Sequence, residues 1–318
     1  MEKTHLMTKI LTSLLFFYSA ISVGGNVVVY TAHGPEIYEP LFKEFRKING
    51  DIKIDVVVLG TGEMFQRVRA EQSNPAADLT FGGPVQSYDI NADLYQASTL
   101  DADKMAMIKD GDSRWHAFTV FTQPLLVNTH LVKPSEYPTT VASLLDTDWS
   151  KKGGLLLANP NHSGTGYSIV AGLANGMGWD FTTQLIKTAK AVPGSTPMFN
   201  GVKDGEAAAG WINEDLGAKW EAQGLPVKMI YPTDALTVQV DAYGLVQNAP
   251  NAQDAKKLMA FIGSVKGQEI AVKTINRRSV RTDVKPPVGL PKLGELPLFP
   301  AKEPQSIVNA RFTKILEK

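Results

Sequence analysis

The chain repeats one unit, a buried strand followed by a glycine-containing loop and a helix, and this repetition constrains its fold more than any other feature. Residues 26–30 (NVVVY) predict a buried strand, the polar loop TAHGPE follows, and apolar side chains then recur at helical spacing as far as Ile48. Residues 53–59 predict a second strand, residues 63–72 a second helix, and residues 78–83 (DLTFGG) a third strand with its glycine turn. We therefore expect an α/β fold with a parallel sheet that carries helices on both faces.

The same unit returns in the middle of the chain, which predicts a second α/β lobe. Residues 155–160 (LLLANP) and 207–213 (AAAGWIN) predict strands, and each is followed by a predicted helix. Near the C-terminus, six prolines between Pro286 and Pro304 favour a surface loop, and a short terminal helix follows it.

Two threonine- and valine-rich stretches flank the second lobe, at residues 115–128 and 236–248. Their alternating character suits strands that cross between the lobes. The chain would then leave the first lobe and return to it. We expect a first lobe of residues 23–121 with 241–318, a second lobe of residues 122–240, and a hinged cleft between them.

Residues 1–22 have the pattern of an exporting signal peptide. Lys3 and Lys9 precede an apolar run over residues 10–23, and Ala20 and Ser22 stand at the small-residue positions that the signal peptidase requires. The run is too short to span a bilayer with ease. We expect cleavage near Ser22 and a mature protein in the periplasm.

Charge and cysteine content exclude several classes of protein. The 32 lysines and arginines equal the 32 aspartates and glutamates, so the chain has no broad basic surface and we expect no nucleic-acid partner. The sequence has no cysteine, which excludes disulfides, thiolate metal sites and a lipid anchor on an N-terminal cysteine. We expect a monomer that binds no metal and no cofactor.

Ligands of open α/β sheets bind beyond the carboxyl ends of the strands, where loops and helix starts converge. In the first lobe these loops contain a histidine and small or hydroxyl-bearing residues, which let the backbone approach a ligand. The candidate ligand-binding residues there are Thr31, His33, Thr61, Gly62 and Gly83. Glu63 is assigned to a cap of the helix that follows.

The loop HSGTGYS follows the strand at residues 155–160 and is a candidate anion site. Ser163, Gly164, Thr165 and Gly166 offer hydroxyls and bare amides at a helix start, where the helix dipole favours an anion. The alternative is an ordinary helix cap, in which a hydroxyl satisfies the first amides. A catalytic serine is disfavoured because the pattern GxSxG is absent.

Asn213 ends the predicted strand at residues 207–213, and Glu214 and Asp215 begin the helix that follows. Carboxylates accept hydrogen bonds, so these acids would suit the hydroxyls of a sugar or an ammonium group of a ligand. The alternative is that they only complement the helix dipole. A ligand with a phosphate at one end and hydroxyls or an amine at the other would satisfy both loops.

Other polar or aromatic residues favour structural roles. We assign Trp211 to the core, and Asp234 and Asp241 to hydrogen bonds in turns and at the hinge. The arginine cluster that begins at Arg277 is assigned to solvated surface, although a guanidinium could reach an anion in the cleft.

The motifs VVVYTAHGPE, GTGEMFQRVRAEQSNPAADLTFGG, GEAAAGWIN and VDAYGLVQNAPN, in this order after a signal peptide, resemble the extracellular solute-binding proteins of ABC importers. The resemblance spans nearly the whole mature chain and is closest to the ferric-ion-binding-protein branch, whose relatives also bind hexose phosphates and aminoethylphosphonate. It implies a two-lobed, type II periplasmic binding protein fold that catalyses no reaction. It also implies delivery of the solute to an ABC permease in the inner membrane.

The same resemblance separates the possible ligands. Members that hold ferric ion use a tyrosine pair where this chain has Glu214 and Asp215, and no Tyr-Tyr pair occurs among its nine tyrosines. His33 matches a histidine of the iron site and Glu63 an acidic position, so a partial ligand set remains. We expect a small phosphorylated solute, with hexose phosphate first; aminoethylphosphonate and ferric iron are the alternatives. A secreted phosphate-ester hydrolase is disfavoured because neither HExxH nor paired metal-ligand clusters occur.

Overall fold

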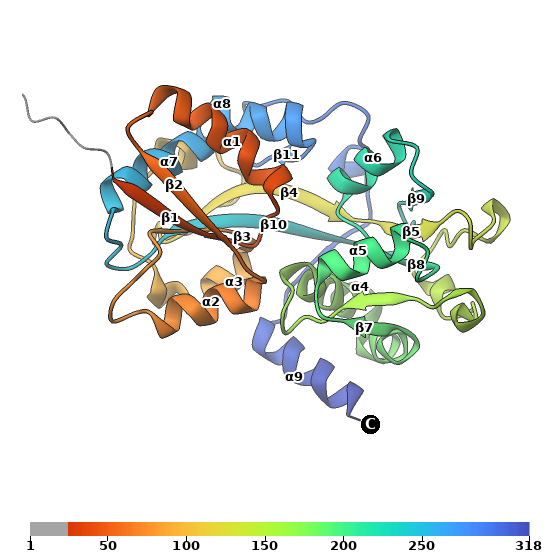
Figure 1. Cartoon of the computed structure of the whole chain (residues 1–318). Helices are drawn as coiled ribbons and strands as arrows, with labels where there is room; N and C mark the ends of the chain where they lie inside the picture. The colour runs from red at the N-terminus through yellow and green to blue at the C-terminus, as the bar shows by residue number, and fades with distance from the viewer. Residues whose placement is uncertain (1–24, 318) are drawn as a thin grey trace, which may run out of the picture.

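The described chain forms two lobes that lie side by side and are joined by long strands (Figure 1). The structure is a computed structural model that describes residues 25–317. The predicted signal peptide and its cleavage site lie outside these residues. Within the described range, the helices are all too short or too polar to cross a membrane.

The first lobe is built on a seven-stranded sheet in the order β11-β4-β10-β3-β1-β2, with β12 paired to β10. Its strands are β1 (Asn26–Thr31), β2 (Lys53–Val58), β3 (Leu79–Pro84), β4 (His116–Gln123), β10 (Leu236–Leu245), β11 (Arg278–Ser279) and β12 (Leu298–Pro300). Strand β1 is parallel to β2 and β3, whereas β10 is antiparallel to β3 and β4. The expected parallel sheet is therefore mixed, because β10 returns from the second lobe in the opposite direction.

Helices cover both faces of this sheet, with α1, α7 and α8 on one side and α2 and α3 on the other (Figure 1). Their bounds are α1 (Pro35–Ile48), α2 (Thr61–Ala70), α3 (Val85–Asp89), α7 (Ala252–Gly263) and α8 (Val265–Ile270). Helix α1 begins with a proline at its first position, and its buried residues Ile37, Leu41 and Phe45 recur at the spacing of one helical face.

The second lobe contains two small sheets and the longest helix. Strands β5 (Leu125–Asn128), β8 (Ala209–Trp211) and β9 (Val227–Ile230) form one sheet, and β6 (Leu156–Ala158) pairs with β7 (Lys190–Val192) in the other. The helices are α4 (Gly164–Thr188), α5 (Ser195–Lys203), α6 (Glu214–Ala222) and α9 (Gln305–Leu316). Short helical turns complete the fold: η1 (Ala92–Leu94), η2 (Asp101–Met105), η3 (Pro134–Glu136), η4 (Ala142–Leu144), η5 (Trp149–Lys152), the π-helical η6 (Ala271–Ile275) and η7 (Leu293–Glu295).

The two lobes have separate hydrophobic cores, and the C-terminal segment joins the second one. Val308 and Phe312 of α9 are fully buried in the core of the second lobe. The expected first lobe included residues 241–318, so the structure corrects that boundary. The proline-rich stretch also differs from a plain loop, because it contains β12, which pairs with the start of β10. The chain thus returns to the second lobe along this strand.

Three chain segments lie side by side at the junction of the lobes. Strand β4 passes through Pro124 into β5, β10 enters from the second lobe, and β12 leaves toward α9. Gln123 pairs with Thr237, and Thr237 pairs with Phe299 on its other side. The junction is therefore a narrow ribbon of three hydrogen-bonded strands.

Candidate functional site

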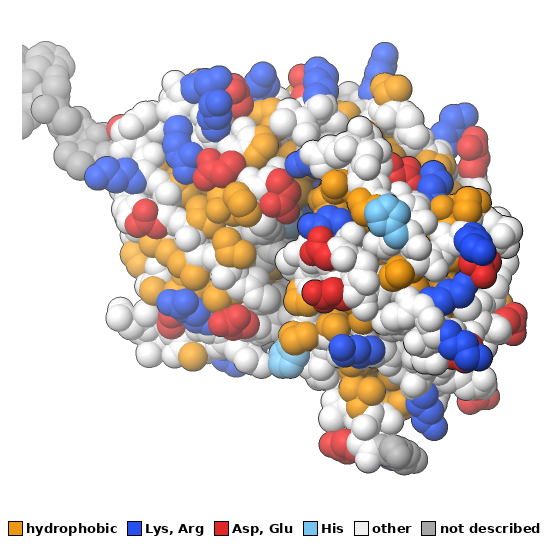
Figure 2. All heavy atoms as spheres, turned by 45° about the vertical axis from the view of Figure 1, so that its right-hand side comes forward, with side chains coloured by type: hydrophobic (Ala, Val, Ile, Leu, Met, Phe, Trp, Pro, Cys, Tyr) orange, Lys and Arg blue, Asp and Glu red, His pale blue; other side chains and the backbone are white. Residues whose placement is uncertain are grey.

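A cleft of about 630 Å³ lies between the lobes and is lined by residues of both. Figure 2 shows the groove between the lobes, with acidic and basic side chains scattered over this face of the molecule. The cleft is formed by the loops that follow β1, β2, β3 and β8 and by the loops that precede α4 and α5. This is the edge at which the strand-end loops were expected to meet.

Five helices begin at this cleft. Their N-cap residues are Gly34 of α1, Gly60 of α2, Ser163 of α4, Gly194 of α5 and Asn213 of α6. No side chain caps the described starts of α1, α2, α5 or α6. Free amides and the positive ends of the helix dipoles therefore face one space, which favours a bound anion.

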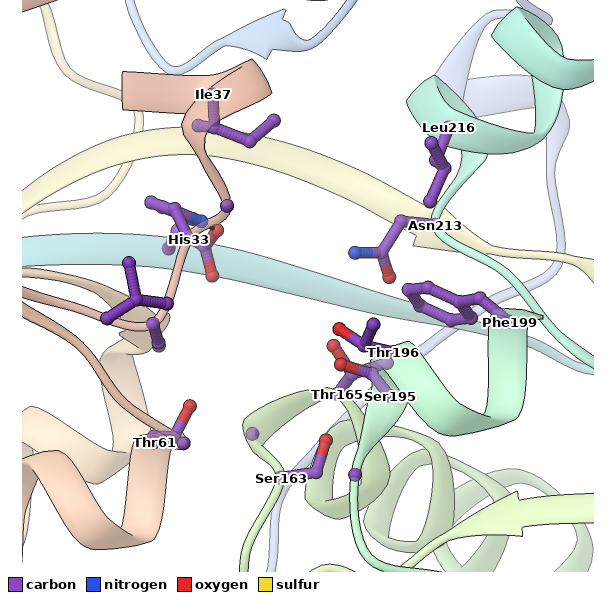
Figure 3. A pocket seen from close by; sticks show the side chains of 18 of the residues that line it. His33, Ile37, Thr61, Ser163, Thr165, Ser195, Thr196, Phe199, Asn213 and Leu216 are labelled. Carbon is purple, nitrogen blue, oxygen red and sulfur yellow. Dashed lines mark ion pairs between the residues drawn. The ribbon is translucent and has the colours of Figure 1, made fainter. Parts of the chain in front are cut away.

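Hydroxyl side chains gather on the second-lobe wall of the cleft. Ser163 and Thr165 at the start of α4 lie beside Ser195 and Thr196 at the start of α5, and Thr61 faces them from the first lobe (Figure 3). The Ser163 hydroxyl also accepts a hydrogen bond from the Gly166 amide at 3.1 Å, so the expected helix cap exists. Capping and anion binding are compatible here, because the hydroxyl proton remains free to be donated.

Ser195 and Thr196 did not appear among the residues expected from the sequence. The signal was present, since PGST at residues 193–196 repeats the pattern of a glycine before hydroxyl residues at a helix start. Phe199 and Asn200, one turn further along α5, also line the cleft.

The inner end of the cleft holds an arginine between two aspartates. Arg277 donates from Nε to Asp215 Oδ2 at 3.1 Å and from Nη1 to Asp241 Oδ2 at 2.7 Å. Its guanidinium also lies 4.2 Å from the centre of the Phe121 ring, and only 3% of the residue is exposed. The expected surface position of this arginine is wrong, because two buried carboxylates hold it inside.

Burial raises the pKa of Asp241 to about 6, with the nearby charge of Arg277 acting against the rise. Burial also raises the pKa of Asp215. Both rises come from burial in a place that excludes water, and Arg277 offsets them only in part because it serves two carboxylates. Gln239 supplies a further hydrogen bond to Asp241 Oδ1.

His33 lies beside this cluster as a neutral side chain. Its Nε2 is 3.4 Å from Asp241 Oδ2 but makes no hydrogen bond. Burial, and then repulsion from Arg277, hold the pKa of His33 well below its usual range. The close approach to Asp241 is therefore not a charged pair. Gly82 has a φ of +97°, and a Cβ there would lie 2.8 Å from the His33 ring, so this position needs glycine.

Eight of the twelve residues expected to bind ligand line the cleft: His33, Thr61, Gly83, Ser163, Gly164, Thr165, Asn213 and Asp215. Of the three residues assigned to structural roles, Asp241 lines the cleft, whereas Trp211 is in the core as expected. Asp234 accepts the amides of Val141 and Ala142 outside the cleft, as expected of a turn residue.

The other four expected binding residues do not line the cleft. The Thr31 hydroxyl donates to the Phe81 carbonyl and accepts from the His33 amide, so it shapes the loop that carries His33. Gly62 packs against the Asn161 backbone, and Gly166 packs against the Ala158 backbone.

Glu214 is the fourth of these residues, and it is fully buried. It accepts two hydrogen bonds from Arg278 and one from the Thr122 amide. The expected contact between Glu214 and a ligand is therefore wrong in this structure, because the carboxylate is turned toward the first-lobe sheet. Only Asp215 of the adjacent acidic pair faces the cleft.

The donor set of the cleft is a poor match to a metal site. Among residues 25–317, no group of three or more histidine, cysteine, aspartate or glutamate side chains is placed to hold a metal ion. No tyrosine of the described chain lines the cleft.

Comparison with known proteins gives a family match. A family model described as bacterial extracellular solute-binding protein matches residues 74–292, which is more than half of the chain. A Salmonella typhimurium periplasmic protein, named provisionally for binding 2-aminoethylphosphonate, is 25% identical over 267 residues. The match covers 78% of this chain and 75% of that protein.

Solved structures share the fold. The periplasmic binding protein AfuA from Actinobacillus pleuropneumoniae, with exogenous fructose-6-phosphate bound, has a TM-score of 0.83 at 21% identity, over 92% of this chain and 99% of that one. Iron-bound HitA from Pseudomonas aeruginosa has a TM-score of 0.73 at 18% identity, over 92% and 97% of the two chains. The expected periplasmic binding protein fold is confirmed.

Proposed function

The chain belongs to the bacterial extracellular solute-binding proteins, and we propose that it captures a small phosphorylated organic solute, with hexose phosphate as the first choice. As a member of this family it is a solute-binding protein of an ABC transporter, and it binds its solute without transforming it. We further propose export to the periplasm, with signal peptide cleavage near Ser22, and function as a monomer.

The observation that carries this proposal is the convergence of five helix starts on one cleft. Such starts bind phosphate through backbone amides without a cation from the protein. The hydroxyls of Ser163, Thr165, Ser195 and Thr196 add donors on the second-lobe wall. We place the phosphate at this wall, because the exposed Glu36 and Glu63 lie on the opposite wall and would repel it.

Capture would follow from closure of the cleft. The phosphate contacts the starts of α4 and α5, and the rest of the solute contacts the Asp215, Asp241 and Arg277 cluster. A solute that touches both walls only in the closed arrangement shifts the equilibrium between open and closed forms. The closed form would then be presented to the permease in the inner membrane.

The similar proteins support a phosphorylated ligand. One similar structure holds fructose-6-phosphate, and one relative is named for 2-aminoethylphosphonate. Ferric iron is the alternative, supported by the similarity to iron-bound HitA and by the His33 position. Iron is the weaker candidate, because phenolate ligands provide much of the selectivity for ferric ion and the described cleft residues include no tyrosine.

Calorimetric titration of ligand-stripped protein tests this proposal. Glucose 6-phosphate, fructose 6-phosphate, 2-aminoethylphosphonate and ferric citrate would be compared, with glucose as the control that lacks only the phosphate. We expect at least one phosphorylated solute to bind and glucose to bind far more weakly. Binding of iron alone, with a visible charge-transfer band, would overturn the proposal.

A further inference from the structure

The inner end of the cleft carries more negative than positive charge. Asp215 and Asp241 both contact Arg277, and His33 beside them is neutral. With both carboxylates ionised, two negative charges therefore face one positive charge. Arg277 bonds one oxygen of each carboxylate, but its single positive charge cannot balance both.

Several polar atoms at this end have no hydrogen-bond partner within the described chain. They are Asp215 Oδ1, Asn213 Oδ1 and His33 Nε2. The three side chains are all more than nine-tenths buried, with exposed fractions of 4%, 9% and 6%. Figure 3 shows Asn213 projecting from the start of α6 into the space opposite His33. A buried acceptor left without a donor costs about 1–3 kcal/mol, so the oxygens of Asp215 and Asn213 at this end are suited to receive hydrogen-bond donors.

The kind of donor follows from the charge. A sugar hydroxyl supplies one donor and leaves the excess negative charge in place. A protonated amine supplies up to three donors and one positive charge, so two carboxylates would then face two cations. Burial raises the pKa of Asp241 and of Asp215, and the single charge of Arg277 only partly offsets this rise.

We propose that the solute is a zwitterion whose phosphate or phosphonate lies at the starts of α4 and α5 and whose protonated amine is held by Asp215 and Asp241. The class includes amino sugar phosphates and aminoalkylphosphonates. The inference rests on the proposed function and narrows the solute to a phosphorylated compound that carries an amine, so that among the hexose phosphates it favours the amino sugars.

Matched ligands test the inference on the unmodified protein. Glucosamine 6-phosphate is compared with glucose 6-phosphate, and 2-aminoethylphosphonate with 2-hydroxyethylphosphonate, by calorimetry at pH 7.5. Within each pair the members differ mainly in an amine that replaces a hydroxyl. We expect the amine member of the pair that binds to bind at least about ten-fold more tightly. Equal or tighter binding of the hydroxyl members overturns the inference and leaves the proposed function standing.

Asp241→Asn tests the assigned residue. The variant should weaken binding of the amine ligand at least about ten-fold and remove the preference over its hydroxyl partner. Asp55→Asn is the control, because it makes the same change at an exposed acid on β2 and should leave both affinities unchanged. Asp215→Asn is the second variant if Asp241→Asn fails to fold, which thermal melts would reveal. A preference that survives in the folded variants overturns the assignment. Absence of binding by all four compounds would overturn this inference, and absence of binding by fructose 6-phosphate as well would overturn the proposed function.

Discussion

Arg278 and Glu214 form a buried bidentate ion pair that joins the two lobes, with Nε to Oε1 and Nη2 to Oε2 both at 2.8 Å. Arg278 belongs to β11 of the first-lobe sheet, whereas Glu214 begins α6 in the second lobe. The preceding arginine and the following acid, Arg277 and Asp215, repeat the pairing on the side that faces the cleft. The start of α6 is thus held to the first-lobe sheet by two adjacent ion pairs.

Glu214→Gln should lower the free energy of unfolding by about 3–5 kcal/mol, because it leaves the buried Arg278 charge without its carboxylate. Urea denaturation followed by circular dichroism measures this loss. Glu39→Gln is the control, since Glu39 pairs with Arg46 on the surface and should change stability by less than about 1 kcal/mol. An equal and small effect of both substitutions would contradict a structural role for the buried pair.

Substitution of both Ser195 and Thr196 by alanine should weaken binding of the phosphorylated solute by about a hundred-fold or more. Each hydroxyl would otherwise donate to a charged phosphate oxygen, a bond worth about 1.5–3 kcal/mol. Calorimetry with the double variant measures the change. Ser73→Ala, on an exposed turn of the first lobe, should bind as the unmodified protein does. Undiminished affinity in the double variant would place the phosphate elsewhere.

Gly62→Ala should hinder closure of the cleft without loss of stability. A Cβ at Gly62 of α2 would lie 2.5 Å from the Asn161 carbonyl oxygen in the second lobe, so the lobes would have to separate. Alanine within a helix otherwise favours folding. We expect about ten-fold weaker solute binding and an unchanged or higher melting temperature. Gly111→Ala is the control, because nothing lies within 4 Å of a Cβ there. Full affinity in Gly62→Ala would show that solute binding does not need this approach of the lobes.

The raised pKa of Asp241 predicts a stability that depends on pH. Asp241 faces Asp215, Arg277, His33 and Gln239, and its folded pKa of about 6 lies above the usual value of 3.8. The folded state then binds the proton more tightly than the unfolded state does. The contribution of Asp241 to stability is therefore largest below about pH 4 and is lost as the pH rises through 6, by about 3 kcal/mol in all.

Urea midpoints of the unmodified protein and of Asp241→Asn, measured between pH 4 and pH 7, isolate this contribution. Other titrating groups are common to both proteins, so the difference between the two curves reports Asp241. We expect the variant to gain stability relative to the unmodified protein as the pH rises. Parallel curves would mean that Asp241 has an ordinary pKa.

The sequence was most informative where local patterns decide the structure. The apolar runs and helical spacing at residues 26–83 predicted β1, α1, β2, α2 and β3 in order. These elements are determined by the pattern of residues that lie close together in the sequence. The glycine and hydroxyl pattern at Ser163 likewise predicted a helix start. Ser195 and Thr196 carry the same pattern and could have been found in the same way.

The features that the sequence did not predict depend on partners far along the chain. Arg277 and Arg278 lie in a polar segment typical of surface, and their burial follows only from acids that lie 62 and 64 positions away. The orientation of Glu214 away from the cleft has the same cause. Strand β12 was not predicted because the prolines around it favour a loop. They are tolerated because β12 pairs with β10 alone, as an edge strand.

The ribbon of β4, β10 and β12 at the lobe junction determines how the molecule can move. Strands bonded edge to edge flex easily across their flat face and resist shear within their plane. The two halves should therefore swing about one fixed axis, with little twist or sideways drift. A receptor that recognises the loaded form would then meet a single, repeatable geometry.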